Sequence, residues 1–403
     1  MLQRIGLYDA YLATLGGGEN FLAVFAELME KEFPRADVEI ITHDGNHVDV
    51  SILAERFGVT LQRTRIRRLQ LRSRSFMPVR PLRRFFHERD VALISSEYDL
   101  FLNNTIFSVA PSRARHGIYM CMFPLSPEPW SLRELRAQRW FYSPYVAFRR
   151  RLYRRWVGSY DLVLANSDFT RQWIQRIWDL PSEVLYPPVE TRTQHPRTEK
   201  RNRILAIGRF FPGNHNKKHD VLIQAFRRLR REGLEGWELH LVGGKTPVAG
   251  TDEYVSRLER MARGEPIHFH FDADRAELED LLVTSSLFWH ATGFGEQQDR
   301  EPEKLEHFGM STVEAMTYGC VPLVFHCGGQ PEIIEQGKTG MLWRTLDELH
   351  RQTLLLVEDR ALREILSRAA HARSQQFSRS AFRRRALELL GKLPVDRRVR
   401  RIA

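Results

Sequence analysis

The stretch Ile204-Leu205-Ala206-Ile207-Gly208-Arg209-Phe210 begins the unit that decides the fold class. Its first five residues form the short apolar run typical of a buried strand, and apolar residues recur at helical spacing over Asp220–Arg231. A buried strand followed by an amphipathic helix is the repeating unit of a parallel sheet with helices on both faces. The stretch therefore predicts an α/β fold.

The same alternation continues along the chain in both directions. A helix is predicted near Asn20–Lys31, behind the first strand. Further strands are predicted at the apolar runs Ile5–Tyr8, Val38–Thr42, Leu100–Asn104, Gly117–Met120, Asp161–Ser167, Glu238–Gly243, Ile267–Phe271, Ser286–His290 and Val321–Phe325. Two such series predict two doubly wound, Rossmann-like domains.

The boundary between the two series is predicted at a short, polar, proline-bearing stretch, residues 186–202. We therefore expect an N-terminal domain over residues 1–190 and a C-terminal domain over residues 191–380. Residues 381–403 are expected to form a helix and a basic tail that crosses back to the first domain. Ligands of such sheets bind at the carboxyl ends of the strands, so we expect a cleft where the two domains face each other.

The composition favours an anionic partner and a reducing compartment. Lys and Arg number 61 against 50 Asp and Glu, a net charge of +11, which suits nucleic acid, anionic lipid or phosphorylated substrates. Three cysteines without a C-x-x-C pair predict free thiols in the cytoplasm. The sequence has no apolar run of about eighteen residues, and its first residues read as a strand, so neither a membrane span nor a signal peptide is expected.

A glycine-rich turn, Leu15-Gly16-Gly17-Gly18-Glu19-Asn20, lies between the first predicted strand and helix. Glycine lets a backbone approach a phosphate closely, and a helix N-terminus offers free N–H groups and a positive dipole end. The turn is a candidate phosphate site, with a plain tight turn as the alternative.

Three basic residues follow the strand that ends at Gly208. Arg209 comes directly after it, and Lys217 and Lys218 precede the next predicted helix. Fixed cations on the cleft side could neutralise a diphosphate, although most such side chains are simply solvated.

Two glutamates eight positions apart flank a predicted helix start in Glu306-His307-Phe308-Gly309-Met310-Ser311-Thr312-Val313-Glu314-Ala315-Met316. Glu306 is expected in the loop before the helix and Glu314 in its first turns. A carboxylate can accept hydrogen bonds from two sugar hydroxyls, and the N–H groups at the helix start can bind an anion. The alternative is ordinary surface charge.

Together these elements resemble the retaining glycosyltransferases of family four, which have the GT-B fold. The matching residues, in the family's order, are Gly16-Gly17-Gly18-Glu19, Asn166-Ser167 with Phe169-Thr170, Tyr186-Pro187-Pro188-Val189, Gly208-Arg209 with Lys217, Glu306 with Glu314, Gly319-Cys320-Val321-Pro322 and Gly328-Gly329-Gln330-Pro331-Glu332. The resemblance covers most of the chain and is weakest from Val48 to Arg89. Within the family, Lys217-Lys218-His219, Trp289-His290 and Glu306–Gly309 are most similar to oligosaccharide mannosyltransferases and their bacterial relatives.

The resemblance implies catalytic roles for three residues. Arg209 and Lys217 would bind the donor diphosphate and stabilise the leaving group, and Lys218 remains the alternative to Lys217. Glu306 would hold hydroxyls of the donor sugar.

The resemblance also implies how the donor is bound. Glu314 would take the ribose hydroxyls, and the two N-terminal glycines would pack under the diphosphate. The implied donor-binding residues are Gly16, Gly17, Gly208, Phe308, Gly309, Met310 and Glu314, with the backbone N–H groups of Phe308, Gly309 and Met310 contributing.

Histidines are not expected to take part in the chemistry. Many family members carry a histidine in the loop after the fourth or fifth strand, whereas residues 119–124 contain none, so the donor phosphate itself would act as the base. His268 and His270 share one face of a predicted strand, but their spacing fits no known zinc site. With no Asp-x-Asp motif in a plausible cleft position, we expect neither a metal nor a cofactor.

The function implied by the resemblance is retaining transfer of a hexosyl group, mannose or glucose, from a UDP- or GDP-linked donor to a glycan or lipid-linked acceptor. The arginine runs leave a basic nucleic-acid-binding α/β protein as an alternative, although no nucleic-acid partner is expected. A GT-B epimerase of nucleotide sugars is the third possibility.

The acceptor side of the enzyme is expected to meet a membrane. The resemblance implies that the N-terminal domain receives the acceptor, and arginines mix with apolar side chains over Arg63–Arg84 in this domain. That mixture is typical of a helix lying on an anionic leaflet, here broken at Pro78 and Pro81. The alternatives are a solvated helix or a site for a soluble anionic acceptor. Aromatic residues between Phe141 and Trp156 are expected to pack in the core instead of stacking on bases. We thus expect a cytoplasmic protein that is peripheral to the membrane.

Overall fold

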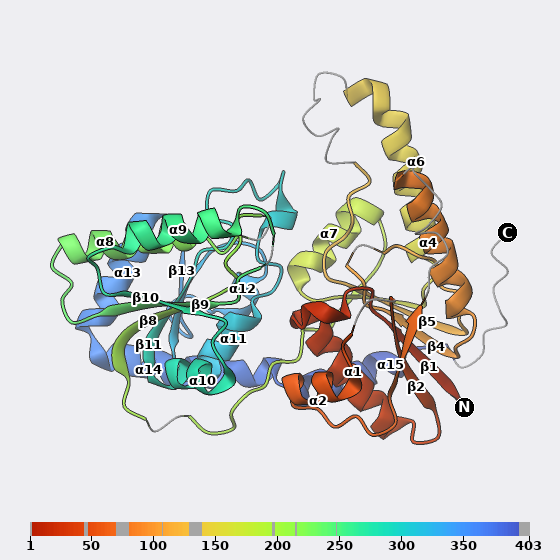
Figure 1. Ribbon diagram of the computed structural model, residues 1–403, viewed down its shortest axis with the longest axis horizontal. Coiled ribbons are helices and arrows are strands. Elements are labelled where there is room, and N and C mark those ends of the chain that lie inside the picture. Colours follow the sequence, from red (N-terminus) through yellow and green to blue (C-terminus); the bar gives the residue numbers. More distant parts are fainter. Residues whose placement is uncertain are drawn as a thin grey trace. The chain divides into compact units, whose positions relative to one another are not determined.

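The computed structural model describes residues 2–43, 47–69, 80–106, 108–128, 139–195, 198–213, 216–246 and 248–394. The chain divides into two compact units, Met1–Pro188 with Arg379–Ala403, and Val189–Ser378. Each unit is a parallel sheet covered by helices on both faces (Figure 1). The α/β fold class predicted from the sequence is confirmed.

The N-terminal unit holds a sheet in the order β3-β2-β1-β4-β5-β6-β7. Its strands are β1 (Arg4–Tyr8), β2 (Asp37–His43), β3 (Arg65–Leu69), β4 (Leu100–Asn103), β5 (His116–Cys121), β6 (Leu162–Ala165) and β7 (Glu183–Val184). Its helices are the short 3-10 turn η1 (Leu12–Thr14), α1 (Gly17–Glu32), α2 (Val50–Phe57), α4 (Arg80–Ser95), α6 (Arg139–Val157), α7 (Asp168–Trp178) and α15 (Arg379–Leu390). Figure 1 shows α1, α2 and α15 on one face of the sheet and α4, α6 and α7 on the other.

The C-terminal unit holds a sheet in the order β10-β9-β8-β11-β12-β13. Its strands are β8 (Arg201–Ile207), β9 (Glu238–Gly243), β10 (Ile267–Phe271), β11 (Ser285–His290), β12 (Val321–Phe325) and β13 (Met341–Trp343). Its helices are α8 (His219–Arg231), α9 (Thr251–Ala262), α10 (Arg275–Thr284), α11 (Met310–Thr317), α12 (Gln330–Ile333), α13 (Leu346–Glu358), α14 (Arg360–Ser374) and the 3-10 turns η3 (Pro302–Lys304) and η4 (Gln375–Phe377). The strand order reverses between β8 and β11, and ligands of such sheets bind beside that reversal.

Helix α15 belongs to the N-terminal unit although it follows the whole C-terminal unit in the sequence. Phe382, Ala386 and Leu389 are buried in the core of the N-terminal unit. The Phe382 ring meets the ring of Phe21 on α1 edge-on, with centroids 5.3 Å apart. The last helix therefore completes the core that the first helix begins.

The first part of the arginine-rich stretch Arg63–Arg84 is a strand, where the sequence suggested a helix. Arg65–Leu69 forms β3, which pairs in parallel with β2 at the edge of the sheet. The Arg67 guanidinium lies 2.8 Å from the Glu97 carboxylate, and that of Arg68 lies 2.8 Å from Asp49. Ile66 packs on the core and so fixes the strand. The arginines on either side of Ile66 and Leu69 are therefore held where they can pair with carboxylates of the same unit.

Only part of the rest of that stretch is among the described residues. Helix α4 starts at Arg80, so Pro81 lies in its first turn, where proline is tolerated. Arg72, Arg74, Phe76, Met77 and Pro78 lie outside the described residues, as does the basic tail from Arg397 to Arg401.

The aromatic residues of α6 differ in part from expectation. Tyr153 is buried in the core, whereas Tyr145 and Phe148 are 47% and 62% exposed. On the neighbouring helix α4, Phe85 is 48% exposed and its ring lies 6.1 Å from that of Trp156. The two helices thus present aromatic side chains to solvent between the arginines of α6.

Among the helices of the described ranges, none combines the length and the hydropathy that crossing a bilayer requires.

Candidate functional site

The carboxyl end of β8 begins the candidate site. Gly208 follows the strand, and a Cβ atom built at Gly208 would lie 2.4 Å from Cγ of Lys217. Any side chain at position 208 would therefore displace the lysine. The absence of a side chain at Gly208 lets Lys217 lie across the strand end at the start of α8.

Lys217 reaches a carboxylate from a distant part of the chain. Its Nζ lies 2.6 Å from Oε2 of Glu306, in the loop before α11. The same oxygen lies 3.0 Å from Nε2 of His290, the last residue of β11. Residues that follow β8 and end β11 thus meet at the carboxylate of Glu306. We call Lys217, His290, Glu306 and Gln330 the Glu306 cluster.

Gln330 fixes the proton on His290. Its side-chain amide lies 3.4 Å from Nδ1 of His290, and donation from that amide leaves the ring proton on Nε2, facing Glu306. The hydroxyl of Thr292 lies 3.1 Å from the same Nε2. Gln330 is fully buried, and its Oε1 has no hydrogen-bond partner among the described residues.

The charge states follow from burial and pairing. Burial alone would raise the pKa of Glu306, but the Lys217 ammonium and the His290 hydrogen bond hold that pKa well below its usual range. Burial lowers the pKa of His290 despite the carboxylate beside it. At neutral pH the cluster therefore contains an ionised glutamate, an ammonium and a neutral imidazole.

Backbone packing holds the Glu306 loop in place. A Cβ atom at Gly328 would lie 2.0 Å from the carbonyl oxygen of Glu306, and one at Gly329 would lie 2.4 Å from that of His307. The Gly329 N–H donates to the Glu306 carbonyl at 2.9 Å. The glycine pair after β12 is thus required so that the two loops can lie against each other.

Gly309 occupies a strained position at the start of α11. Its φ of +119° lies in the left-handed half of the map, and a Cβ atom would lie 2.6 Å from Nε2 of Gln330. Gly337 offers a control, because its φ is +71° and a Cβ atom there would meet nothing within 4 Å.

We expect Gly309→Ala to lower the free energy of unfolding by about 1–3 kcal/mol more than Gly337→Ala, because it must push aside a buried, hydrogen-bonded amide. Gly337→Ala should cost only the strain of a positive φ, about 1–2 kcal/mol. Thermal and urea unfolding of both variants measure the difference. Equal losses would show that Gln330 moves freely and does not fix His290.

Arg209 is the cation with the most freedom in this region. It is exposed, its guanidinium lies 5.9 Å from the centroid of the Phe211 ring, and no ion pair to it is found within the described residues. Lys218 differs, because its Nζ lies 2.7 Å from the Glu296 carboxylate. Lys218 lines a separate cavity of about 360 Å³, bounded by Pro212, Gly213, Asn216, Asp220, Arg257, Glu296 and Lys304.

The start of α11 holds the other predicted residues of this unit. Phe308 is buried, with its ring 5.5 Å from that of Phe377, and Met310 is the first residue of the helix. The first N–H groups of a helix have no partner within it and can bind an anion. Glu314 is half-buried one turn further along the helix.

The glycine turn of the N-terminal unit caps α1. The backbone N–H of Gly16 donates to the Glu19 carboxylate at 2.6 Å, so the Glu19 side chain caps the start of the helix, which begins at Gly17. Burial and the charge of Glu19 raise the pKa of nearby Asp9 to about 7. Phosphate binding by Gly16 and Gly17 stays a prediction.

Two doubly wound units in one chain are the architecture of the GT-B fold. The family described as "Glycosyl transferases group 1" matches residues 189–373, and "Glycosyltransferase Family 4" matches residues 15–193. The chain therefore belongs to these glycosyltransferases, as its sequence motifs indicated.

The individual relatives share only a minority of their aligned residues with this chain. A GDP-Man:Man(3)GlcNAc(2)-PP-Dol alpha-1,2-mannosyltransferase of Xenopus laevis is 28% identical over 49% of this chain. The human alpha-1,3/1,6-mannosyltransferase ALG2 is 26% identical over 62% of this chain and 64% of its own length. The chain spans only 41% of the length of the Xenopus relative.

The solved structures show the same fold. Anabaena Alr3699/HepE in complex with UDP-glucose aligns with 98% of this chain and 100% of its own, with a TM-score of 0.67 and 19% identity. This likeness concerns the fold.

Sequence reasoning singled out Lys217 and Glu306 but not their partners. His290 and Gln330 were named only as members of motifs that match the family, and neither was given a role in the site. The position of His290 could have identified it, because it ends a strand on the side of the sheet where ligands bind.

Proposed function

We propose that this chain is a retaining, metal-independent glycosyltransferase that moves a hexosyl group from a nucleotide-sugar donor to a glycan or lipid-linked acceptor. The observation that carries the proposal is the Lys217–Glu306 pair, at the strand ends beside the sheet reversal in a chain of this family. GDP-mannose is the first donor to test, because the curated relatives are named as GDP-mannose-dependent enzymes. UDP-glucose is the second.

Arg209 and Lys217 would stabilise the diphosphate leaving group in this proposal. An ammonium has three N–H donors, and the pair with Glu306 uses one of them, which leaves two for phosphate oxygens. Preorganised cations at the place where charge develops lower the barrier without a metal ion. Lys217 lies across the end of β8 and shares the Glu306 carboxylate with His290, whereas Lys218 pairs with Glu296 and lines another cavity, and this favours Lys217 for the role.

Glu306 would hold the donor sugar, since its second oxygen remains free to accept hydroxyl hydrogen bonds beyond the Oε2 contacts with Lys217 and His290. Glu314 would accept from the ribose. The N–H groups of Phe308, Gly309 and Met310 would bind phosphate or sugar oxygens at the start of α11. The donor phosphate would act as the base, as the family resemblance implies.

A binding and turnover experiment tests the proposal. We expect GDP, GDP-mannose, UDP or UDP-glucose to raise the Tm of the full chain, because a ligand that binds only the folded state stabilises it. Nucleotide release from the preferred donor should persist in excess EDTA. No shift with any of the four, together with salt-sensitive binding of duplex DNA, would replace the proposal by the nucleic-acid alternative. A donor epimerised without transfer would indicate the epimerase.

A lipid-linked acceptor agrees with the surface of α4 and α6. Phe85 and Phe148 are exposed there, and α6 carries Arg149, Arg150, Arg151, Arg154 and Arg155. Exposed aromatic side chains among arginines suit insertion at an anionic headgroup layer. We propose that this surface, and not β3, holds the protein at the cytoplasmic leaflet.

We expect the chain to sediment with phosphatidylserine vesicles at low salt and to be released by salt. Phe85→Ser with Phe148→Ser should lower the bound fraction several-fold. Ile365→Ser on α14 is the control, because Ile365 is 64% exposed and belongs to the other unit. Equal binding to neutral vesicles, or equal loss in the control, would contradict a role for this surface.

A further inference from the structure

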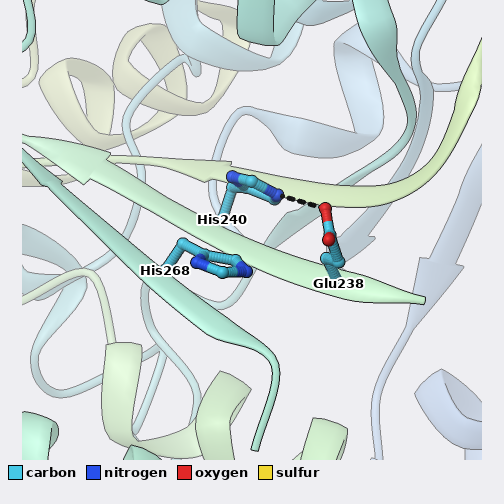
Figure 2. Close-up of side chains that lie close together, drawn as sticks. All are labelled: Glu238, His240 and His268. Carbon is cyan, nitrogen blue, oxygen red and sulfur yellow. Dashed lines mark hydrogen bonds and ion pairs between the residues drawn. The ribbon is translucent and has the colours of Figure 1, made fainter. Parts of the chain in front are cut away.

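A second cluster of chemically active side chains lies at the edge of the C-terminal sheet, away from the Glu306 cluster. Glu238 and His240 alternate along β9 and so share one face, and His268 on the edge strand β10 is the register partner of His240. Figure 2 shows the three side chains gathered on this face. One ligand atom from each lies within 4.8 Å of the other two.

Two further residues extend the cluster into a chain of hydrogen bonds. Nε2 of His240 lies 3.1 Å from the Glu238 carboxylate, and Nδ1 of His240 lies 3.0 Å from Nε2 of His270. Nδ1 of His270 lies 2.6 Å from the carboxylate of Glu277 on α10. Two imidazoles are thus held in series between two carboxylates.

This series lacks one proton when both imidazoles are neutral. Three contacts need three hydrogens, but a neutral imidazole carries only one N–H, so the two rings supply two. If the ring protons point toward Glu277, the lone pair of His240 Nε2 faces the Glu238 carboxylate. The charge of the missing proton could be supplied by a cation on that lone pair, which would share the Glu238 carboxylate with the Arg203 guanidinium that already pairs with it.

The position of His268 favours a metal ion over a proton between His240 and Glu238. A proton between His240 and Glu238 needs only those two groups, whereas His268 brings a third ligand atom to the same point. His268 is exposed, so a fourth position is open to water. Arg203 also donates to Oε2 of Glu238, at 3.2 Å, and leaves Oε1 of that carboxylate available.

We propose that Glu238, His240 and His268 bind a divalent transition metal ion, with zinc as the best fit. Two imidazoles, one carboxylate and a water form a common four-coordinate donor set for zinc. Ligand atoms around tetrahedral zinc lie about 3.3 Å apart, so small side-chain rotations close the present separation. His270 and Glu277 are positioning residues, because a metal-bound imidazole usually donates its other N–H to a partner that orients it.

The metal site is separate from the proposed reaction. Glu238 and His240 lie in the first half of β9, whereas the Glu306 cluster lies beyond the carboxyl ends of the strands. The ion would tie the edge strand β10 to β9. Its expected effect is on the stability of the unit and not on nucleotide release.

Titration of the EDTA-treated, dialysed full chain tests the site. We expect one equivalent of zinc by calorimetry, a rise in Tm, and visible absorption bands of tetrahedral cobalt when Co²⁺ is the probe. His268→Ala should abolish the cobalt bands, and because His268 is exposed, its truncation leaves the fold intact. His270→Ala should weaken zinc binding about 10–100-fold, the usual effect of removing such a partner.

His47→Ala is the matched control, since His47 is an exposed histidine of the N-terminal unit. No binding at millimolar zinc would overturn the proposal and leave a proton as the missing charge. Undiminished binding in His268→Ala would overturn it as well, because the metal would then lie elsewhere. GDP binding by the metal-free chain is measured in parallel, so that failure of the metal site and failure of the transferase proposal are told apart.

Discussion

Arg209→Ala and Lys217→Ala should each lower nucleotide release from a saturating donor by about a hundredfold or more, the scale of losing one preorganised charge donor. Each change removes a cation from the place where charge develops on the leaving diphosphate. Donor affinity should fall less, because the helix start and the remaining cation still bind the phosphates. Stopped assays at several donor concentrations separate kcat from KM.

The neighbouring lysine sharpens this test. Lys218 pairs with Glu296 and lines a cavity that does not include the Glu306 cluster, so Lys218→Ala should leave most of the turnover. Lys338→Ala measures the effect of losing a remote lysine, since the Lys338 side chain is 78% exposed. A large loss in Lys218→Ala with near-normal turnover in Lys217→Ala would transfer the role to Lys218. Near-normal turnover in both Arg209→Ala and Lys217→Ala would refute the leaving-group assignment.

Glu306→Gln should mainly lower turnover, whereas Glu314→Gln should mainly lower the affinity for the nucleotide. Glu306→Gln should lower turnover by about a hundredfold, because the sugar loses the group that orients it. Its affinity for the nucleoside diphosphate alone should hold or improve, since the change frees the Lys217 ammonium from its carboxylate. Glu314→Gln should weaken that affinity about tenfold or more, the worth of a hydrogen bond to a charged group.

Isothermal titration with GDP or UDP, followed by turnover with the matching donor, separates the two glutamates. Glu335→Gln is a control, because Glu335 lies in another loop and its carboxylate pairs with Arg373. Equal losses of nucleotide affinity in Glu306→Gln and Glu314→Gln would contradict the division of roles between sugar and ribose.

Most of the strands that the sequence revealed are largely buried, although the edge strand β10 was predicted as well. β12 is an unbroken apolar run and β11 has one at its centre, Leu287–Trp289, because both strands are buried between helices. β3 escaped prediction because arginines occupy three of its five positions, and an edge strand needs only Ile66 and Leu69 against the core. β7 has two residues, too few to show the alternation of apolar and polar residues that marks a strand.

The candidate site was visible in the sequence only in pieces. Lys217 and Glu306 stand 89 positions apart, and only the family resemblance placed them together before the structure showed the contact. The edge cluster was missed for a related reason. His268 and His270 fit no zinc spacing by themselves, and their partner His240 lies on another strand, so only the register of β9 and β10 joins them.

The return of α15 to the N-terminal unit has a consequence for how the protein is made. A ribosome delivers residues 1–188 first, but the side chains of Phe382, Ala386 and Leu389 that seal their core emerge only after the entire second unit. During synthesis the nascent first half must therefore wait with an apolar surface of α1 uncovered, a state in which chaperones bind. Premature termination after Ser378 would then harm the half of the molecule made earliest and spare the half made last.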